Sequence, residues 1–302
     1  MIEYDIIKSS SDKSNIELAY TIPNTEVKGI VQFSHGMSEH KERYFDFMKY
    51  LSANGYICVI NDHRGHGNSV KDKKDLGYFY TEDTSFIIND LHDVTLYIKN
   101  KYPNQKLYLF SHSMGTLVAR GYMQKYDYEI EKIVLCGAPT KNSFTIFAII
   151  MAYLFKVIGL GKKENRILNY LTFKNYNKGY YIENQWLSKN PDNVKEYNDD
   201  ELCGFIFTTN GFINLYKLLN RAFNKKMYKV KNRKLKILLI AGNNDPVIQS
   251  EKHFKQLEKF LNKVGYNNTK SKLYPQLRHE ILNEKEKEEI YVDVLNFIEE
   301  NT

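Results

Sequence analysis

The residue best placed to do chemistry is Ser113, at the centre of the segment Ser111-His112-Ser113-Met114-Gly115. A G-x-S-x-G turn between a strand and a helix puts its central serine at an exposed apex, and small residues on each side let strand and helix approach closely. Ser111 replaces the first glycine, and we expect so small a residue to fit. At the helix N-terminus, the Met114 amide would point at an oxyanion formed beside Ser113. The pattern predicts a nucleophile; an ordinary helix-capping serine is the alternative.

Two residues downstream could activate that hydroxyl. A serine needs a general base, and the base needs a group that orients it. Asp245 ends the apolar run 236–245 and precedes a proline, and His279 lies just past a probable strand. We therefore expect His279 to be the base and Asp245 to orient it. The alternatives are an aspartate that only shapes a turn and a histidine in a solvated loop.

The segment Phe33–Tyr44, "FSHGMSEHKERY", could complete an oxyanion hole. His35 and Gly36 let the chain turn tightly after an apolar run. The backbone amide of Met37 is then the expected second donor, with Ser38 as the runner-up. We expect His35 to order this loop rather than to transfer protons.

Alternating strand and helix patterns must position these residues. Near-continuous apolar runs are typical of strands buried on both faces, and apolar residues spaced three and four apart indicate helices between them. Such alternation predicts an α/β fold with a mostly parallel sheet flanked by helices. The runs that each read as a strand followed by a turn are 28–36, 56–67, 106–115, 132–139 and 236–245, and the helical patterns are 44–51, 87–98 and 290–298.

The alternation stops between residues 141 and 231, where no clear strand pattern occurs. We interpret this segment as a helical insertion, or lid, set into a core domain made of residues 1–140 and 232–302. Within it, Phe144–Leu160 has no polar face, so a helix there must be buried or must face lipid. Seventeen residues fall short of the ~20 that span a bilayer. Two interpretations remain open: a helix packed against protein only, or one that lines an acyl tunnel and dips into a membrane surface.

Composition narrows the remaining classes. The formal net charge of +7 and a basic segment at 225–236 favour anionic surfaces weakly, but no Lys/Arg block with interleaved aromatics indicates nucleic-acid binding. Cys58, Cys136 and Cys203 show no metal-ligand spacing, and Cys58 and Cys136 lie in apolar runs typical of buried thiols. The polar N-terminus lacks the layout of a signal peptide, so the expected location is cytoplasmic.

Four segments together resemble one family. "SHGMSEHKERY", "NDHRGHGNS", "SHSMGT" and "AGNNDPV…RHE" are similar to motifs of the monoacylglycerol lipase and lysophospholipase group of α/β-hydrolases, also called the serine aminopeptidase S33 type. The order serine, aspartate, histidine along the chain is that of α/β-hydrolases. The resemblance implies an α/β-hydrolase fold with a helical lid inserted before the strand that bears the acid. The departures are Ser111 for glycine and Thr116 where many relatives have a further glycine.

The resemblance also implies roles for individual residues. Ser113 would be the nucleophile, His279 the base and Asp245 its orienter, with the Met37 and Met114 amides as the oxyanion hole. Structural roles beside the site would fall to His35, Gly36, Glu39, His40, Arg43, Arg64 and His66.

The sequence therefore predicts a serine hydrolase that cleaves monoacylglycerol or lysophospholipid esters through an acyl-enzyme, with no metal or organic cofactor and no nucleic-acid partner. A peptidase or small-ester hydrolase of the same fold stays open, because acidic residues of the insertion could hold a substrate amine. The candidates for that role are Glu183, Asp199, Asp200 and Glu201. A catalytically silent binding module is a third alternative, since fold alone does not fix function.

Overall fold

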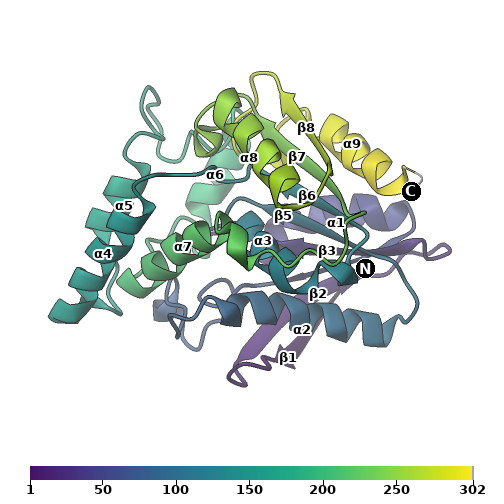
Figure 1. The fold of residues 1–302 in the computed structure, drawn as a ribbon, viewed down its shortest axis with the longest axis horizontal. Coiled ribbons are helices and arrows are strands. Elements are labelled where there is room, and N and C mark those ends of the chain that lie inside the picture. The colour runs from purple at the N-terminus through teal and green to yellow at the C-terminus, as the bar shows by residue number, and fades with distance from the viewer. Residues whose placement is uncertain (301–302) are drawn as a thin grey trace.

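A computed structural model describes residues 1–300 and contains one eight-stranded sheet (Figure 1). Its strands are β1 (Ile2–Lys8), β2 (Asn15–Thr21), β3 (Gly29–Ser34), β4 (Tyr56–Asn61), β5 (Leu107–His112), β6 (Lys132–Cys136), β7 (Lys236–Gly242) and β8 (Asn268–Tyr274). They lie in the order β1-β2-β4-β3-β5-β6-β7-β8. Every neighbouring pair from β4 to β8 is parallel, whereas β1, β2 and β4 pair antiparallel. The sheet is thus mostly parallel, as predicted.

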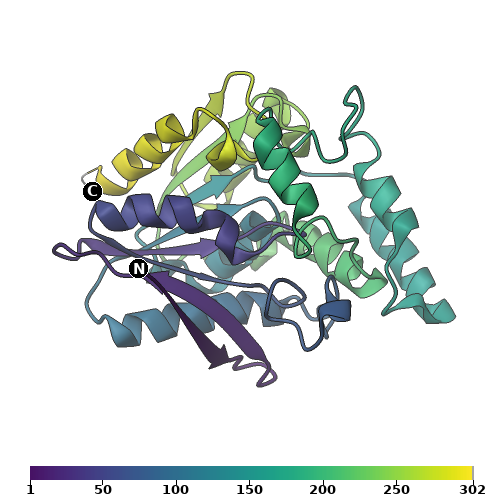
Figure 2. The same cartoon turned by 180° about the vertical axis from the view of Figure 1, so that it is seen from behind.

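Helices cover both faces of this sheet, as Figures 1 and 2 show. On one face, α1 (Phe45–Ala53) and α9 (Lys287–Glu299) pack around Phe33 and Phe110. On the other, α2 (Ser85–Lys101), α3 (Met114–Tyr126) and α8 (Glu251–Val264) pack around Leu109 and Ile133. Every residue of β3, β4, β5 and β6 is buried. This two-sided burial explains the continuous apolar runs in the sequence.

The insertion, residues 141–231, lies between β6 and β7. Its helices are α4 (Thr145–Phe155), α5 (Arg166–Phe173), α6 (Pro191–Asp199) and α7 (Thr209–Ala222). In Figure 1, α4 and α5 form the end of the molecule opposite α9. Short 3-10 turns occur at Lys41–Tyr44, Lys73–Asp75, Asp127–Glu129, Lys225–Met227, Pro246–Ile248 and Ile281–Asn283.

The apolar segment 144–160 is not one straight helix. A π-helical turn, Lys156–Leu160, follows α4, and Ile158 and Gly159 leave helical geometry, with φ of +87° at Gly159. Ala152 is fully buried, but much of the apolar surface of this segment is exposed, so the rest of this chain covers it only in part. The exposed residues are Phe144, Ile146, Phe147, Ile150, Leu154, Val157 and Ile158. Within residues 1–300, no helix combines the length and apolarity needed to cross a bilayer.

No pattern in the sequence indicated the antiparallel edge formed by β1 and β2. Most residues of β1 are exposed, so its sequence, "IEYDIIK", lacks the apolar run that marked the inner strands. Register with β2, in which Ile2 lies opposite Thr21, places β1 at the sheet edge. Edge strands of this kind carry little sequence signal because packing does not constrain both faces.

Candidate active site

The turn between β5 and α3 holds Ser113 at a strained apex, with φ of +51° and ψ of −121°. A Cβ atom at Gly115 would lie 2.1 Å from the Ser34 carbonyl oxygen, so this position requires glycine. The hydroxyl of Ser111 donates to the Val134 carbonyl at 3.0 Å, and that of Thr116 donates to the Ser113 carbonyl at 2.7 Å. Both departures from the family motif are therefore accommodated by a hydrogen bond.

Asp245 follows β7 and His279 follows β8, and the two side chains meet. The Nδ1 of His279 lies 2.9 Å from Oδ2 of Asp245, and both residues are buried. Gly137, just past β6, packs against this pair: a Cβ atom there would lie 3.0 Å from Nδ1 of His279. Its φ of +58° also favours glycine. The arrangement leaves Nε2 of His279 as the nitrogen that could serve as a base.

A cavity of about 730 Å³ brings the candidate residues together. Ser113, His279, Met37 and Met114 all line it, while Asp245 lies behind His279. No hydrogen bond joins the Ser113 hydroxyl to the His279 imidazole among the described residues. Such bonds are often long before substrate binds and shorten in the reacting complex.

The two candidate amide donors flank Ser113. Met114 is the first residue of α3, where a backbone N–H has no carbonyl acceptor within the helix. Met37 follows Gly36, and a Cβ atom at Gly36 would lie only 3.1 Å from Cβ of Ser113. The absence of a side chain at Gly36 thus lets the Met37 loop approach the serine.

A buried carboxylate, that of Glu39, holds the Met37 loop in place. Its Oε1 accepts the Gly36 N–H, the Tyr44 hydroxyl at 2.8 Å and Nδ1 of His112 at 3.2 Å. Nε2 of His112 lies 3.2 Å from the His279 carbonyl oxygen. Because both partners of His112 are hydrogen-bond acceptors, this geometry favours an imidazole that donates from both ring nitrogens and carries a positive charge.

The pKa shifts agree with this assignment. Burial alone would lower the pKa of His112, but the hydrogen bond and the charge of Glu39 raise it. Burial would raise the pKa of Glu39, yet the His112 hydrogen bond and the charges of His112 and Arg43 hold it well below its usual range. These opposite shifts favour a buried ion pair between Glu39 of the Met37 loop and His112 of the turn that carries Ser113.

The other loop residues lie behind the cavity rather than in it. The backbone N–H of His63 donates to Nε2 of His35 at 2.9 Å, and burial holds the pKa of His35 well below its ordinary value. His66 packs on the rings of Phe79 and Phe207, and burial lowers its pKa to about 4. Neither His66 nor Arg64 lines the cavity.

Arg64 acts at a distance from the site. Its Nε lies 2.7 Å from Oδ2 of Asp90 in α2, and its Nη1 lies 3.1 Å from Oδ2 of Asp12 in the turn after β1. Arg64 therefore ties the loop after β4 to α2 and to the N-terminal hairpin, a role that the sequence did not indicate.

The acidic residues of the insertion are mostly engaged elsewhere. Asp199 pairs with Lys195, and Glu201 lies 3.4 Å from Lys73, both on the surface. Asp200 lies 2.8 Å from Nε2 of His40. Only Glu183, of the four candidates for binding a substrate amine, lines the cavity.

The three cysteines are buried, as predicted for Cys58 and Cys136. Cys203 lies near His40 and Asp200, with the three ligand atoms within 4.8 Å of one another, a proximity that sequence spacing did not reveal. Burial raises the pKa of the Cys203 thiol, although the positive charge of Arg43 partly opposes this rise. That same positive charge would repel a metal cation bound by these three residues. This cluster is better explained as the contact between the His40 loop and the insertion.

The sequence matches the family described as serine aminopeptidase, S33, over residues 25–286. The chain belongs to this family. A monoacylglycerol lipase of Mycolicibacterium smegmatis is 24% identical to it over 94% of this chain and 93% of its own. The human monoglyceride lipase is 26% identical over 64% of this chain and 58% of its own. The family and these relatives support ester hydrolysis as the class of activity.

Solved structures show the same fold. A thermostable carboxyl esterase from Bacillus coagulans, in complex with glycerol, superposes with a TM-score of 0.91 at 23% identity, covering 98% of this chain and 97% of its own. The monoacylglycerol lipase of Paleococcus ferrophilus gives a TM-score of 0.70 at 21% identity, covering 93% and 98%. The chain has an α/β-hydrolase fold.

Proposed function

We propose that this protein is a serine esterase that cleaves monoacylglycerol or lysophospholipid esters through an acyl-enzyme. The observation that carries the proposal is the convergence of three groups on one cavity: the Ser113 hydroxyl, the Asp245–His279 pair and the two candidate amide donors. The same cavity is lined by many apolar side chains of the insertion, which suits an acyl chain. Phe147, Ala148, Met151, Leu168, Phe173, Leu215 and Leu219 are among them.

The proposed reaction has two steps. In the first, Ser113 attacks the ester carbonyl while Nε2 of His279 accepts the hydroxyl proton and then passes it to the leaving alcohol. Asp245 holds the Nδ1–H and stabilises the imidazolium. The Met37 and Met114 amides stabilise the oxyanion, and the loss of one such donor costs about 3–4 kcal/mol in comparable enzymes. In the second step, water activated by His279 releases the acid.

Replacement of the nucleophile tests this function. Ser113→Ala should lower kcat for p-nitrophenyl butyrate and for a monoacylglycerol by about 10³-fold or more, with an unchanged circular dichroism spectrum. Ser111→Ala, which removes a hydroxyl two residues away, is the matched control and should retain turnover. Full turnover in Ser113→Ala would refute the proposal.

Glu183 keeps an aminopeptidase as the second candidate. Glu183 lines the cavity, and its carboxylate could pair with a substrate amine. A panel of monoacylglycerols, lysophosphatidylcholine and aminoacyl amides separates the two functions. We expect the lipid esters to be hydrolysed, and hydrolysis of the amides alone would favour the peptidase.

We further propose that residues 141–231 act as a lid whose α4–α5 end touches a lipid surface. The exposed apolar residues there include Val157, at 81% exposure, and Ile167, at 56%. Lys162, Lys163 and Arg166 are exposed between them in the chain. Apolar residues beside basic ones favour shallow binding to anionic lipid. Such contact would let a lipid ester enter the cavity from the membrane.

A further inference from the structure

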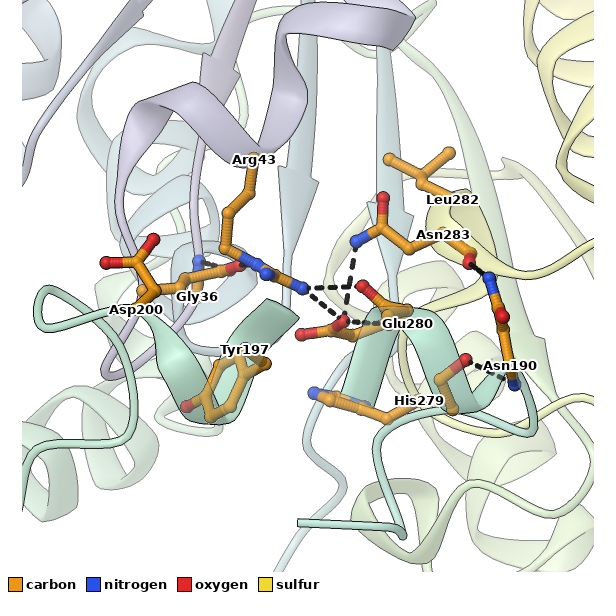
Figure 3. A network of polar contacts seen from close by, with 12 residues as sticks. Gly36, Arg43, Asn190, Tyr197, Asp200, His279, Glu280, Leu282 and Asn283 are labelled. Carbon is orange, nitrogen blue, oxygen red and sulfur yellow. Dashed lines mark hydrogen bonds and ion pairs between the residues drawn. The ribbon is translucent and has the colours of Figure 1, made fainter. Parts of the chain in front are cut away.

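A second polar cluster lies beside His279, centred on the buried guanidinium of Arg43 (Figure 3). Nη2 of Arg43 lies 2.6 Å from Oε2 of Glu280, the residue after His279. Its Nε lies 3.5 Å from Oε2 of Glu39, which anchors the Met37 loop. One cation therefore links the loop that would supply an oxyanion amide to the loop that would supply the base.

Asn193, in α6, joins the insertion to this ion pair. Its side-chain amide donates to Oε2 of Glu280 at 2.7 Å, and its carbonyl oxygen accepts from Nη2 of Arg43 at 3.0 Å. Arg43, Glu280 and Asn193 thus form a closed triangle. We call these three residues the clamp.

Two further attachments hold the same pair of segments together. The backbone N–H of Glu280 donates to the Leu187 carbonyl at 2.8 Å. The carboxylate of Glu284 accepts from the Ser188 hydroxyl and the Lys189 N–H, each at 2.9 Å. The loop that carries His279 is therefore fixed to residues 187–193 of the insertion as well as to the sheet.

Burial makes the clamp stiff. The side chains of Arg43 and Glu280 are 8% and 3% exposed, so water cannot replace a lost partner. Burial alone would lower the pKa of Arg43, but the negative charges of Glu280 and Glu39 raise it above its ordinary value. A buried charge without its partner is costly, so the triangle has one favoured arrangement.

We propose that the clamp positions the His279 imidazole relative to Ser113 and the Met37 amide, so that part of the insertion is built into the catalytic geometry. This inference rests on the proposed function. The hydrogen bonds among the three residues join Arg43, Glu280 and Asn193 to one another and not to Ser113 or to the His279 imidazole, so these are positioning residues. A displacement of about 1 Å in a catalytic group can lower the rate by about 10²-fold. The clamp would prevent such a displacement of the His279 imidazole.

The test compares Asn193→Ala and Glu280→Gln with Glu82→Gln. The control removes a different ion pair of the insertion, between Glu82 and Lys156 at 2.5 Å, which is remote from the catalytic loops. We expect kcat for p-nitrophenyl butyrate to fall about ten- to hundredfold in the two clamp variants, with KM within about twofold. Labelling of Ser113 by a fluorophosphonate should slow by the same factor, and Glu82→Gln should match the wild type in both assays. The double variant should lose little more kcat than either single variant, because both substitutions disrupt the same hydrogen-bonded triangle.

The outcomes separate the clamp from the function on which it rests. If the wild type labels at Ser113 and both clamp variants label and turn over at its rate, the clamp is refuted while the esterase stands. If the wild type does not label, the esterase is refuted and the clamp with it. Should Glu280→Gln fail to fold, Asn193→Ala decides alone, because it leaves the Arg43–Glu280 ion pair intact. A loss seen only as a lower melting temperature, with normal kcat per folded molecule, would also refute the positioning role.

Discussion

The two sides of the insertion differ in how they meet the rest of the protein. Residues 187–193 and α6 attach to the catalytic loops through buried ions and hydrogen bonds. In contrast, α4 and α5 present exposed apolar side chains at the end of the molecule. The difference suggests that one inserted segment serves two purposes. In the two proposals above, the polar side positions the catalytic loops, and the apolar side contacts substrate or lipid.

Substitutions at two glycines with left-handed backbones test the difference between the catalytic loops and the apolar side of the insertion most sharply. Gly137→Ala should lower kcat about 100-fold, because its Cβ would meet His279 at 3.0 Å. Gly159→Ala, in the apolar region, has φ of +87° but open space around it, so it should cost about 1 kcal/mol of stability and leave kcat unchanged. Steady-state kinetics with p-nitrophenyl butyrate decides. Equal losses of kcat in the two variants would contradict the comparison.

The apolar side is tested with vesicles of phosphatidylcholine and phosphatidylglycerol. Replacing Ile150 and Val157 with serine should weaken partitioning about tenfold, which corresponds to the loss of about 1.4 kcal/mol of apolar burial. Hydrolysis of a soluble ester should stay within about twofold. Leu96→Ser, on α2, is the control because Leu96 is 50% exposed, close to the 53% of Ile150, and this variant should partition as the wild type does. Unchanged partitioning of the double variant in a sedimentation assay would argue against lipid contact.

The catalytic loops to which the polar side attaches should show a pH dependence of stability through His112, which bridges Glu39 and the His279 carbonyl. Because the folded-state pKa of His112 is raised, its protonation contributes stability fully below its ordinary value of 6.5, and this contribution is lost as pH rises through the folded pKa. The depressed pKa of Glu39 keeps that partner ionised above 4.5. His112→Gln should therefore cost about 1–3 kcal/mol at pH 5.5 and less at pH 9.5, measured by urea unfolding. A cost that is the same at both pH values would contradict the charged state of His112.

The smallest effect is expected at Ser111, which departs from the family motif. Ser111→Gly removes a hydrogen bond to the Val134 carbonyl and should cost about 1–2 kcal/mol of stability. Turnover should stay within about twofold, because that hydroxyl points away from Ser113. A change in kcat of more than tenfold would show that the turn depends on this residue.

Much of the fold and the location of the cavity followed from the sequence. Apolar runs buried on both faces indicated β3 to β7, and the carboxyl ends of parallel strands meet at one edge of a sheet. Residues that follow β5, β7 and β8 were therefore expected to converge, and Ser113 and His279 do line one cavity.

The sequence did not predict the contacts between side chains that are far apart along the chain. Arg43 and Glu280 are 237 residues apart, and Asn193 comes from the insertion, where no pattern indicated a partner. The family resemblance gave Arg43 a structural role beside the site, and Glu280 directly follows His279, but neither signal indicated that these two residues pair with each other. Arg64 lay in a recognisable motif, yet its partners Asp90 and Asp12 turn it away from the cavity. Such pairings follow from tertiary packing, which local periodicity does not encode.

The central claim is that Ser113 is the nucleophile, activated by His279. The most direct measurement is to treat the protein with a fluorophosphonate and to map the adduct by peptide mass spectrometry. We predict a single adduct on Ser113, formed quickly in the wild type, slowly in His279→Ala and not at all in Ser113→Ala. An adduct on another residue, or continued ester hydrolysis in Ser113→Ala, would contradict the account.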